Sequence, residues 1–218
     1  TARERGVPPS RLSGADIEHP FHGVYRRLDG EPRAPGGIGP SLDPRTGSAE
    51  WRRRQLRNAQ TLAPFLPPGF FFCGRTAAVI WRLPVPAARS EDLEVACFSP
   101  GRALRMRGVR GSRIDPRLAG ITRRHGLPVT DAATTWCLLA PGLAVRDGVA
   151  LGDAAIRRPR IPGTRRLERE PYATPEDLER ATMVPFRRRR PALLGMLPLL
   201  STQSASAPET HLRLMLQE

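Results

Sequence analysis

Near the start of the chain, small polar and basic side chains are spaced in a way that could read a nucleic acid. Ser10, Arg11 and Ser13 follow two prolines that fit the opening of a helix. We expect this helix to carry Leu12 and Ile17 towards a core. Small polar side chains on a helix can reach base edges, and a guanidinium can bind phosphate. The segment is therefore a candidate for the base-reading part of a DNA-binding surface.

Two arginines follow the next apolar run. The residues FHGVYRRL alternate well enough for a strand, and Arg26 and Arg27 lie near its end. In a winged-helix reader, basic residues on a hairpin contact phosphates while a helix contacts bases. We expect His22, Arg26 and Arg27 to face the DNA backbone in such an arrangement. The alternative interpretation is a solvated arginine-rich corner whose apolar side chains simply pack.

The charge balance favours a polyanionic partner. The 218 residues include 35 basic and 21 acidic side chains, which gives a formal net charge of +14. A sequence pI of about 11.5 is typical of proteins that bind nucleic acid or another polyanion. Every basic residue is arginine and none is lysine, a bias that accompanies GC-rich genomes. Part of the arginine content therefore reflects codon supply.

The cysteines indicate neither a metal site nor a disulfide framework. Cys73, Cys97 and Cys137 lie far apart, form no Cys-x-x-Cys pair and do not cluster with histidines. Their apolar neighbours predict buried, reduced thiols, as in a cytoplasmic protein. The sequence contains no recognisable signal peptide and no apolar run of membrane-spanning length. We therefore expect a cytoplasmic protein without membrane contact and without a bound metal.

Helical and strand patterns are mixed rather than strictly alternating. Helical spacing of apolar residues predicts helices over 49–66, 75–83, 131–140, 145–158 and 174–182. Short apolar runs predict strands in PPGFFFCG, DLEVACFSPG and RMRGVRGSRI, and the last two are a candidate pair. This pattern predicts the α+β class and argues against a doubly wound parallel sheet.

Polar residues mark the beginnings of three of the helices. Thr130 is the expected N-cap of the helix over 131–140. Thr174 and Asp177 have the spacing of a capping box, in which each side chain accepts a hydrogen bond from the other residue's backbone. Ser206 and Glu209 have the same spacing, so the helix near the end of the chain is expected to begin there.

Other motifs receive ordinary structural interpretations. The run FRRRR at 186–190 could neutralise phosphates, but we favour a solvated connector. Asp153 and Arg157 are four residues apart on a predicted helix and are expected to form a surface ion pair. Trp136 and Cys137 lie on an apolar helix and are expected in the core, where the thiol would not act as a nucleophile.

The order of the motifs resembles one bacterial family. GVPPSRLSGADIEHPFHGVYRR resembles the N-terminal winged-helix domain of AbiEi-family antitoxin-like proteins. RNAQTLAPFLPPGFFFCGRTAAVIWRLPVP, LEVACFSPG, RGVRG, GLPVTDAATTWCLLA and GVALGDAAIRR resemble, in order, the AbiEi-like region of that family. In those proteins the region precedes a nuclease-like domain similar to very-short-patch-repair (Vsr-like) endonucleases. The resemblance covers most of the chain and includes no catalytic signature.

The resemblance divides the chain into five parts. These are a partial winged-helix-like segment at 1–28, a linker at 29–48, an AbiEi-like α+β domain at 49–158, an arginine-rich connector with short helices at 159–204 and, at 205–218, a stub of the first helix of the nuclease-like domain. Because the chain begins at Thr1, we expect the winged helix to lack its first helix. The rest of the nuclease core would lie beyond Glu218.

The resemblance gives Glu209 the acidic position of the helix that opens the nuclease core. Metal-dependent cleavage needs several carboxylates to hold a divalent ion such as Mg²⁺, and one glutamate is not enough. We therefore interpret Glu209 as a helix cap and expect no catalytic residue and no cofactor in this chain. A metal would be required only together with the rest of the nuclease domain.

The resemblance implies a DNA-binding, antitoxin-like transcriptional regulator of a bacterial toxin–antitoxin or phage-defence system. Its expected partners are double-stranded DNA and a cognate toxin protein. One alternative is a truncated DNA endonuclease of the very-short-patch-repair type. Another is a protein-interaction module whose arginine surface only reflects codon usage.

Overall fold

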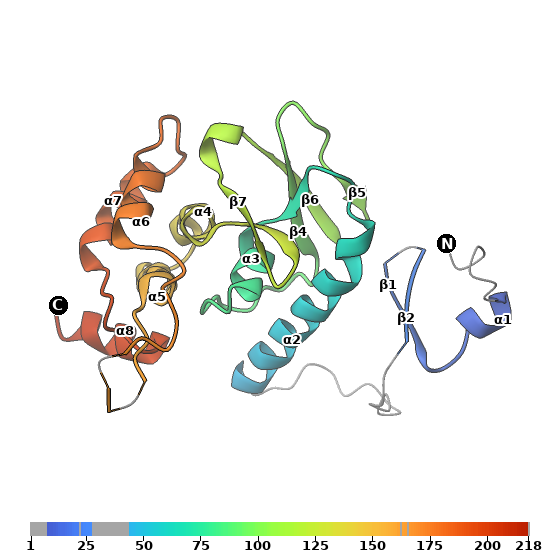
Figure 1. The fold of residues 1–218 in the computed structure, drawn as a ribbon, viewed down its shortest axis with the longest axis horizontal. Helices are drawn as coiled ribbons and strands as arrows, with labels where there is room; N and C mark the ends of the chain where they lie inside the picture. The colour runs from blue at the N-terminus through green and yellow to red at the C-terminus, as the bar shows by residue number, and fades with distance from the viewer. Residues whose placement is uncertain (1–7, 22, 28–43, 162, 165, 218) are drawn as a thin grey trace.

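The computed structural model describes residues 8–21, 23–27, 44–161, 163–164 and 166–217 (Figure 1). It contains a two-stranded sheet, a six-stranded mixed sheet and helices, which confirms the predicted α+β class. His22 and residues 29–43 of the expected linker lie outside the described residues.

The six-stranded sheet has the order β5-β6-β4-β3-β8-β7. Its strands are β3 (Phe70–Phe72), β4 (Leu93–Phe98), β5 (Arg105–Met106), β6 (Val109–Ile114), β7 (Ile121–Arg124) and β8 (Leu127–Thr130). β4 pairs with β6 in parallel along its whole length, so the predicted pairing of these two runs is confirmed. β3 and β8 are also parallel, and the remaining pairs are antiparallel.

Among the residues that the structure describes, seven α-helices follow the N-terminal segment. They are α2 (Pro44–Leu62), α3 (Gly74–Ile80), α4 (Ala132–Leu139), α5 (Val145–Ile156), α6 (Pro175–Met183), α7 (Arg190–Met196) and α8 (Ala207–Met215). Short 3₁₀ turns lie at Ala63–Phe65, Pro116–Leu118, Ala140–Gly142 and Leu197–Leu199. α2 begins five residues before the boundary expected at 48/49, inside the segment interpreted as linker.

One face of the main sheet and the helices share a single apolar core. Trp51 of α2, Trp81 after α3 and Trp136 of α4 belong to the same buried cluster. Phe71 and Cys73 lie in a smaller cluster formed by side chains on the other face. All three cysteines are buried and free, as their apolar neighbours predicted.

The N-terminal segment differs from the expected helix and strand. α1 (Pro9–Leu12) is a single turn, and Ile17 begins strand β1 (Ile17–Phe21) rather than extending the helix. The Ser-Gly pair after Leu12 explains the early end, because both residue types are poor helix formers. β1 pairs with β2 (Val24–Arg27), and Phe21 and Val24 are buried in the main core.

Of the three predicted helix caps, those of α6 and α8 are confirmed and that of α4 is corrected. α6 begins with a complete capping box between Thr174 and Asp177, as predicted. α4 is capped by Asp131 rather than Thr130, since the Asp131 carboxylate accepts a hydrogen bond from the Thr134 amide at 2.6 Å. Thr130 ends strand β8, and its hydroxyl lies 2.8 Å from that of Thr135.

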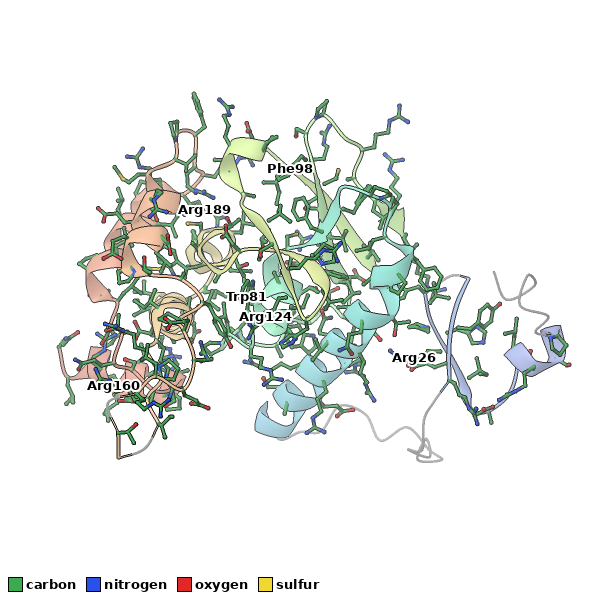
Figure 2. The ribbon with its side chains drawn as sticks, in the orientation of Figure 1. Arg26, Trp81, Phe98, Arg124, Arg160 and Arg189 are labelled. Atoms are coloured by element: carbon green, nitrogen blue, oxygen red, sulfur yellow. The ribbon has the colours of Figure 1, made fainter. Side chains whose placement is uncertain are left out.

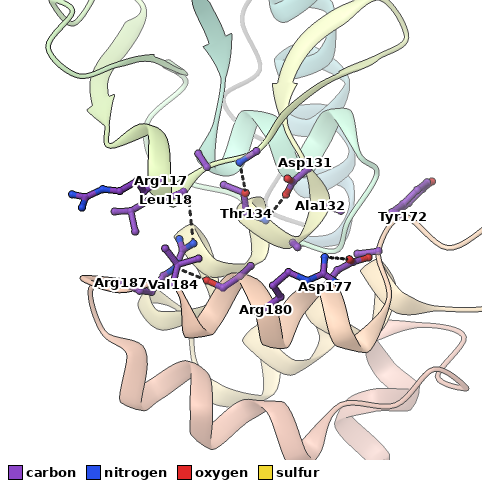
Figure 3. A pocket seen from close by; sticks show the side chains of 15 residues that line it. Arg117, Leu118, Asp131, Ala132, Thr134, Tyr172, Asp177, Arg180, Val184 and Arg187 are labelled. Atoms are coloured by element: carbon purple, nitrogen blue, oxygen red, sulfur yellow. Dashed lines mark hydrogen bonds and ion pairs between the residues drawn. The ribbon is translucent and has the colours of Figure 1, made fainter.

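The arginine run after α6 is only in part the solvated connector that we expected, since Arg188 and Arg189 are exposed but Arg187 is not. Arg187 is buried, and its guanidinium donates to the carbonyls of Ala181 at 2.8 Å and Leu118 at 3.0 Å (Figure 3). It thereby joins the end of α6 to the turn before β7.

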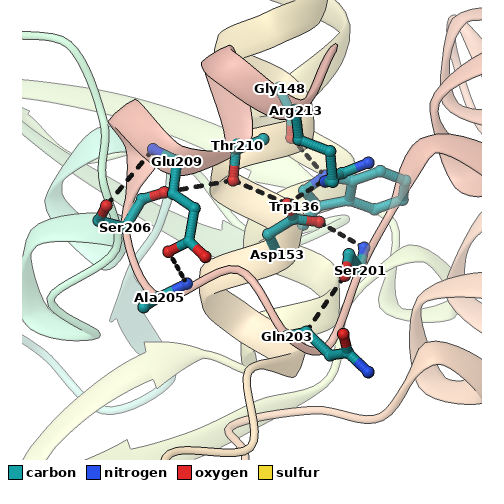
Figure 4. Close-up of polar contacts among 10 residues, drawn as sticks. All are labelled: Trp136, Gly148, Asp153, Ser201, Gln203, Ala205, Ser206, Glu209, Thr210 and Arg213. Carbon is teal, nitrogen blue, oxygen red and sulfur yellow. Dashed lines mark hydrogen bonds and ion pairs between the residues drawn. The ribbon is translucent and has the colours of Figure 1, made fainter. Parts of the chain in front are cut away.

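Asp153 is also placed differently from its prediction. Its side chain is only 2 % exposed, and the proposed surface pair with Arg157 is wrong. The carboxylate accepts hydrogen bonds from the Ser201 amide, the Thr210 hydroxyl and the Arg213 guanidinium (Figure 4). These contacts join α8 to α5, so residues 207–215 pack against the rest of the fold.

Candidate nucleic-acid interface

The opening helical turn presents its polar side chains to solvent. Ser10, Arg11 and Ser13 are all exposed. Arg11, however, forms a forked pair with Asp16, with Nη1–Oδ1 and Nη2–Oδ2 distances of 2.7 and 2.6 Å. These hydrogen bonds from Arg11 lower the pKa of Asp16 to about 2. The Arg11 guanidinium is thus held against Asp16, and it has fewer N–H donors left for a ligand.

Of the two arginines on β2, one faces the protein and one faces outward. Arg26 lies against α2 (Figure 2) and donates to Asn58 Oδ1 at 3.2 Å and to Thr61 Oγ1 at 2.8 Å. It also pairs with Glu18 on β1. The geometry therefore assigns Arg26 to the junction of the hairpin with α2, instead of the expected DNA backbone contact. The Arg27 side chain is 72 % exposed, with its Nε 3.6 Å from Asp16.

A second basic element, which the sequence interpretation missed, lies at the edge of the main sheet. Between positions 99 and 114 the chain carries several arginines and no acidic residue. All of these arginines are exposed on β5, β6, their turn or the preceding loop: Arg102, Arg105, Arg107, Arg110 and Arg113. We call this segment the arginine hairpin. Its spacing was readable in RALRMRGVRGSR, which we had interpreted only as a strand.

The charges of the arginine hairpin are poorly compensated. Arg105 and Arg110 are direct cross-strand partners, an arrangement in which like charges repel. Among the described residues, the one ion pair of the arginine hairpin joins Arg110 to Glu94, with Nη1 4.0 Å from Oε1. Such a surface has a strong positive potential and attracts polyanions.

The arginine hairpin lies beside the N-terminal hairpin. Figure 1 shows β1 and β2 next to the sheet edge that carries β5. Gly108, in the β5–β6 turn, has φ +79, and a Cβ there would lie 3.4 Å from the Phe21 ring. A cavity of about 730 Å³ between the two hairpins is lined by His19, Tyr25, Arg107 and the acidic Asp92, among others. The two hairpins therefore present one continuous surface.

Aromatic rings accompany the arginines on this surface. His19 and the exposed Tyr25 make an edge-to-face contact with ring centroids 4.5 Å apart. Arginines that neutralise phosphates give sequence-tolerant nucleic-acid binding, and exposed aromatic rings can add stacking where bases are unpaired. The arrangement can therefore bind a phosphate backbone and make additional ring contacts.

Glu209 lies on the far side of the molecule and acts at the start of α8. Its Oε2 accepts from the Ala205 amide at 2.7 Å, and its own amide donates to Ser206 Oγ at 3.4 Å (Figure 4). This agrees with its interpretation as a helix cap. The described residues contain no group of three or more His, Cys, Asp or Glu side chains placed to hold a metal ion.

Comparison of the chain with protein-family models, with curated protein sequences and with solved structures finds no match. Among the residues with described positions, no helix is both long enough and apolar enough to cross a membrane. Function must therefore be inferred from the geometry and charge of the surface itself.

Proposed function

We propose that this chain binds double-stranded DNA through the arginine hairpin and the adjacent β1–β2 hairpin, and that it performs no catalysis itself. The observation that carries the proposal is the set of exposed, poorly compensated arginines at 102–113. The arginines would bind phosphates, and Ser10, Ser13 and Arg27 would extend the contact from the N-terminal segment.

The biological role that we propose is that of an antitoxin-like transcriptional regulator in the cytoplasm of a bacterium. This role rests on the resemblance of the sequence blocks to AbiEi-family proteins and on the basic surface. A cognate toxin protein is the second partner that we propose. Its binding would be tested by co-purification with the product of a co-transcribed gene.

The test of DNA binding is a salt titration of affinity for a duplex. Each phosphate contact contributes about 0.9 to the slope of log K against log salt concentration. Replacing Arg105, Arg107 and Arg110 by glutamine should therefore make this negative slope shallower by about 3. The variant should also bind the duplex more weakly at every salt concentration.

A matched control carries glutamine at Arg146, Arg158 and Arg188, which are exposed elsewhere on the molecule. It removes the same net charge, so a general charge effect would make both slopes shallower equally. An unchanged slope in the hairpin variant, or no retention of wild-type protein on DNA at low salt, would refute the proposal.

A further inference from the structure

A second concentration of arginines lines a cavity away from both hairpins. The cavity has a volume of about 400 Å³ and lies among α2, the end of α3, α5 and the start of α8. Four arginines line it, and we call it the arginine cavity: Arg52, Arg82, Arg157 and Arg169. This volume is within the range of pockets that hold small molecules.

Arg52 is fixed in place by the backbone. Its Nη1 and Nη2 donate to the carbonyls of Leu83 and Val85 at 2.9 and 2.7 Å. Burial lowers the pKa of Arg52 below that of a free arginine, because the charged form is partly removed from water. Two carbonyls orient this guanidinium but do not neutralise it.

Arg169 is fixed by an aromatic ring. Its guanidinium carbon lies 3.8 Å from the centroid of Tyr172, and that of Arg124 lies 4.8 Å from the same ring. Arg124 also lies over Trp81, and Figure 2 shows these two side chains together at the centre of the molecule. Tyr172 therefore forms one wall of the cavity, and the guanidinium groups of Arg124 and Arg169 lie over its ring.

Arg82 and Arg157 complete the set. Arg82 follows α3 with a left-handed backbone (φ +59), and Arg157 follows the last residue of α5. Arg82 is exposed and Arg157 is partly exposed, and both line the cavity. Both side chains are therefore available to a ligand.

The carboxylates of the cavity do not balance these charges. Asp153 and Glu168 contribute two negative charges against the four arginines. Both Asp153 oxygens are engaged by Ser201, Thr210 and Arg213 (Figure 4). The start of α8 also lines the cavity through Ser206 and Ala207, while the Ala205 amide beside them already donates to Glu209.

We propose that the arginine cavity binds a phosphate monoester dianion. Guanidinium groups match the oxygens of a phosphate in pairs, and a dianion balances the charge of arginines that line one cavity. The same chemistry is offered by a free phosphorylated small molecule and by the terminal phosphate of a nucleic acid. The site shares no residue with the arginine hairpin, so it stands apart from the proposed DNA contact.

The experiment is isothermal titration calorimetry of the full chain with thymidine 5′-monophosphate and with thymidine. The monophosphate should bind and the nucleoside should not. R82Q and R157Q should each lower the affinity for the monophosphate by about tenfold, since each removes a charge-assisted hydrogen bond. R158Q is the matched control, because Arg158 is exposed beside Arg157 and does not line the cavity; its affinity should equal that of the wild type.

A second arm compares a single-stranded oligonucleotide carrying a 5′-phosphate with its 5′-hydroxyl form. Tighter binding of the phosphorylated form, lost in R157Q, would assign the site to nucleic-acid ends, and monophosphate binding alone would assign it to free small molecules. Thermal unfolding of each variant checks that it is folded. Equal binding of thymidine and its monophosphate, equal losses in R157Q and R158Q, or no phosphate preference in either arm would overturn the proposal.

Discussion

At the scale of single residues, Asp153 shows how a helix position can be misread. Its spacing from Arg157 is that of a surface pair, yet both carboxylate oxygens bind groups that lie 48 to 60 residues later in the chain. Local spacing identifies partners on the same helix only when that face is exposed. Here the partners come from the segment at 201–213, which packs against α5. The sequence close to Asp153 therefore does not contain them.

Replacement of Asp153 by asparagine should lower the free energy of unfolding by about 2–3 kcal/mol, because it leaves the partly buried Arg213 guanidinium without its anion. Denaturant unfolding measures this loss. R157Q serves as the comparison and should stay within about 0.5 kcal/mol of the wild type. Equal effects of the two substitutions would restore the surface pair as the correct description.

Arg11 and Arg26 make the same point about charge. Both were candidates for DNA contact, and both have a carboxylate of β1 or the preceding turn as partner, Asp16 and Glu18 respectively. The pattern correctly indicated that Arg11 is exposed, but it could not show that acidic side chains of the hairpin pair with both arginines. Arg27 remains oriented towards solvent.

At the scale of elements, the capping box of α6 is the clearest local success of the sequence. Thr174, Pro175 and Asp177 lie within four residues, so their spacing alone decides the geometry. The cap of α4 was misplaced by one residue, because Thr130 and Asp131 are both good caps and only the end of strand β8 decides between them.

Thr174→Ala should destabilise the protein by about 1 kcal/mol at neutral pH. The hydrogen bond from the Thr174 amide lowers the pKa of Asp177, so its stabilising effect is present above the ordinary aspartate value near 3.9 and is lost as the pH falls towards the lowered one. Asp177→Ala should therefore cost more at about pH 7 than at about pH 2. Unfolding curves at both values measure the difference, and a cost independent of pH would contradict this role for the carboxylate.

At the scale of the whole molecule, residues from the N-terminal hairpin to α7 meet in one core. Phe21 of β1, Trp51 of α2 and Leu193 of α7 belong to the same buried cluster. The five-part division suggested by the sequence blocks therefore does not correspond to separate apolar cores among the described residues. Composition and motif order describe segments, whereas the shared core depends on contacts between segments far apart in the chain.

The shared core predicts cooperative unfolding. Because Trp51, Trp81 and Trp136 all lie in it, tryptophan fluorescence and far-ultraviolet circular dichroism should report the same denaturant midpoint. Two separated midpoints would show that part of the molecule unfolds on its own.

The fold class, the β4–β6 pair, most helices and the buried cysteines were predictable, since each depends on local apolar patterning. The candidate surfaces were not. The arginines of the arginine hairpin were readable in the sequence, but their arrangement needed the register that places Arg105 opposite Arg110. The arginine cavity needed the fold that brings α2 and the loop at Arg169 to line one space. In a chain whose every basic residue is arginine, the amino-acid type alone distinguishes no site.

The two-residue strand β5 has a consequence for handling the protein. It is the outermost strand of the main sheet, and an unprotected sheet edge is a template for pairing with another molecule. Its shortness and flanking guanidinium groups keep neighbouring molecules apart. Neutralising those groups should therefore raise light scattering and lower solubility in low-salt buffer, even in the absence of any nucleic acid.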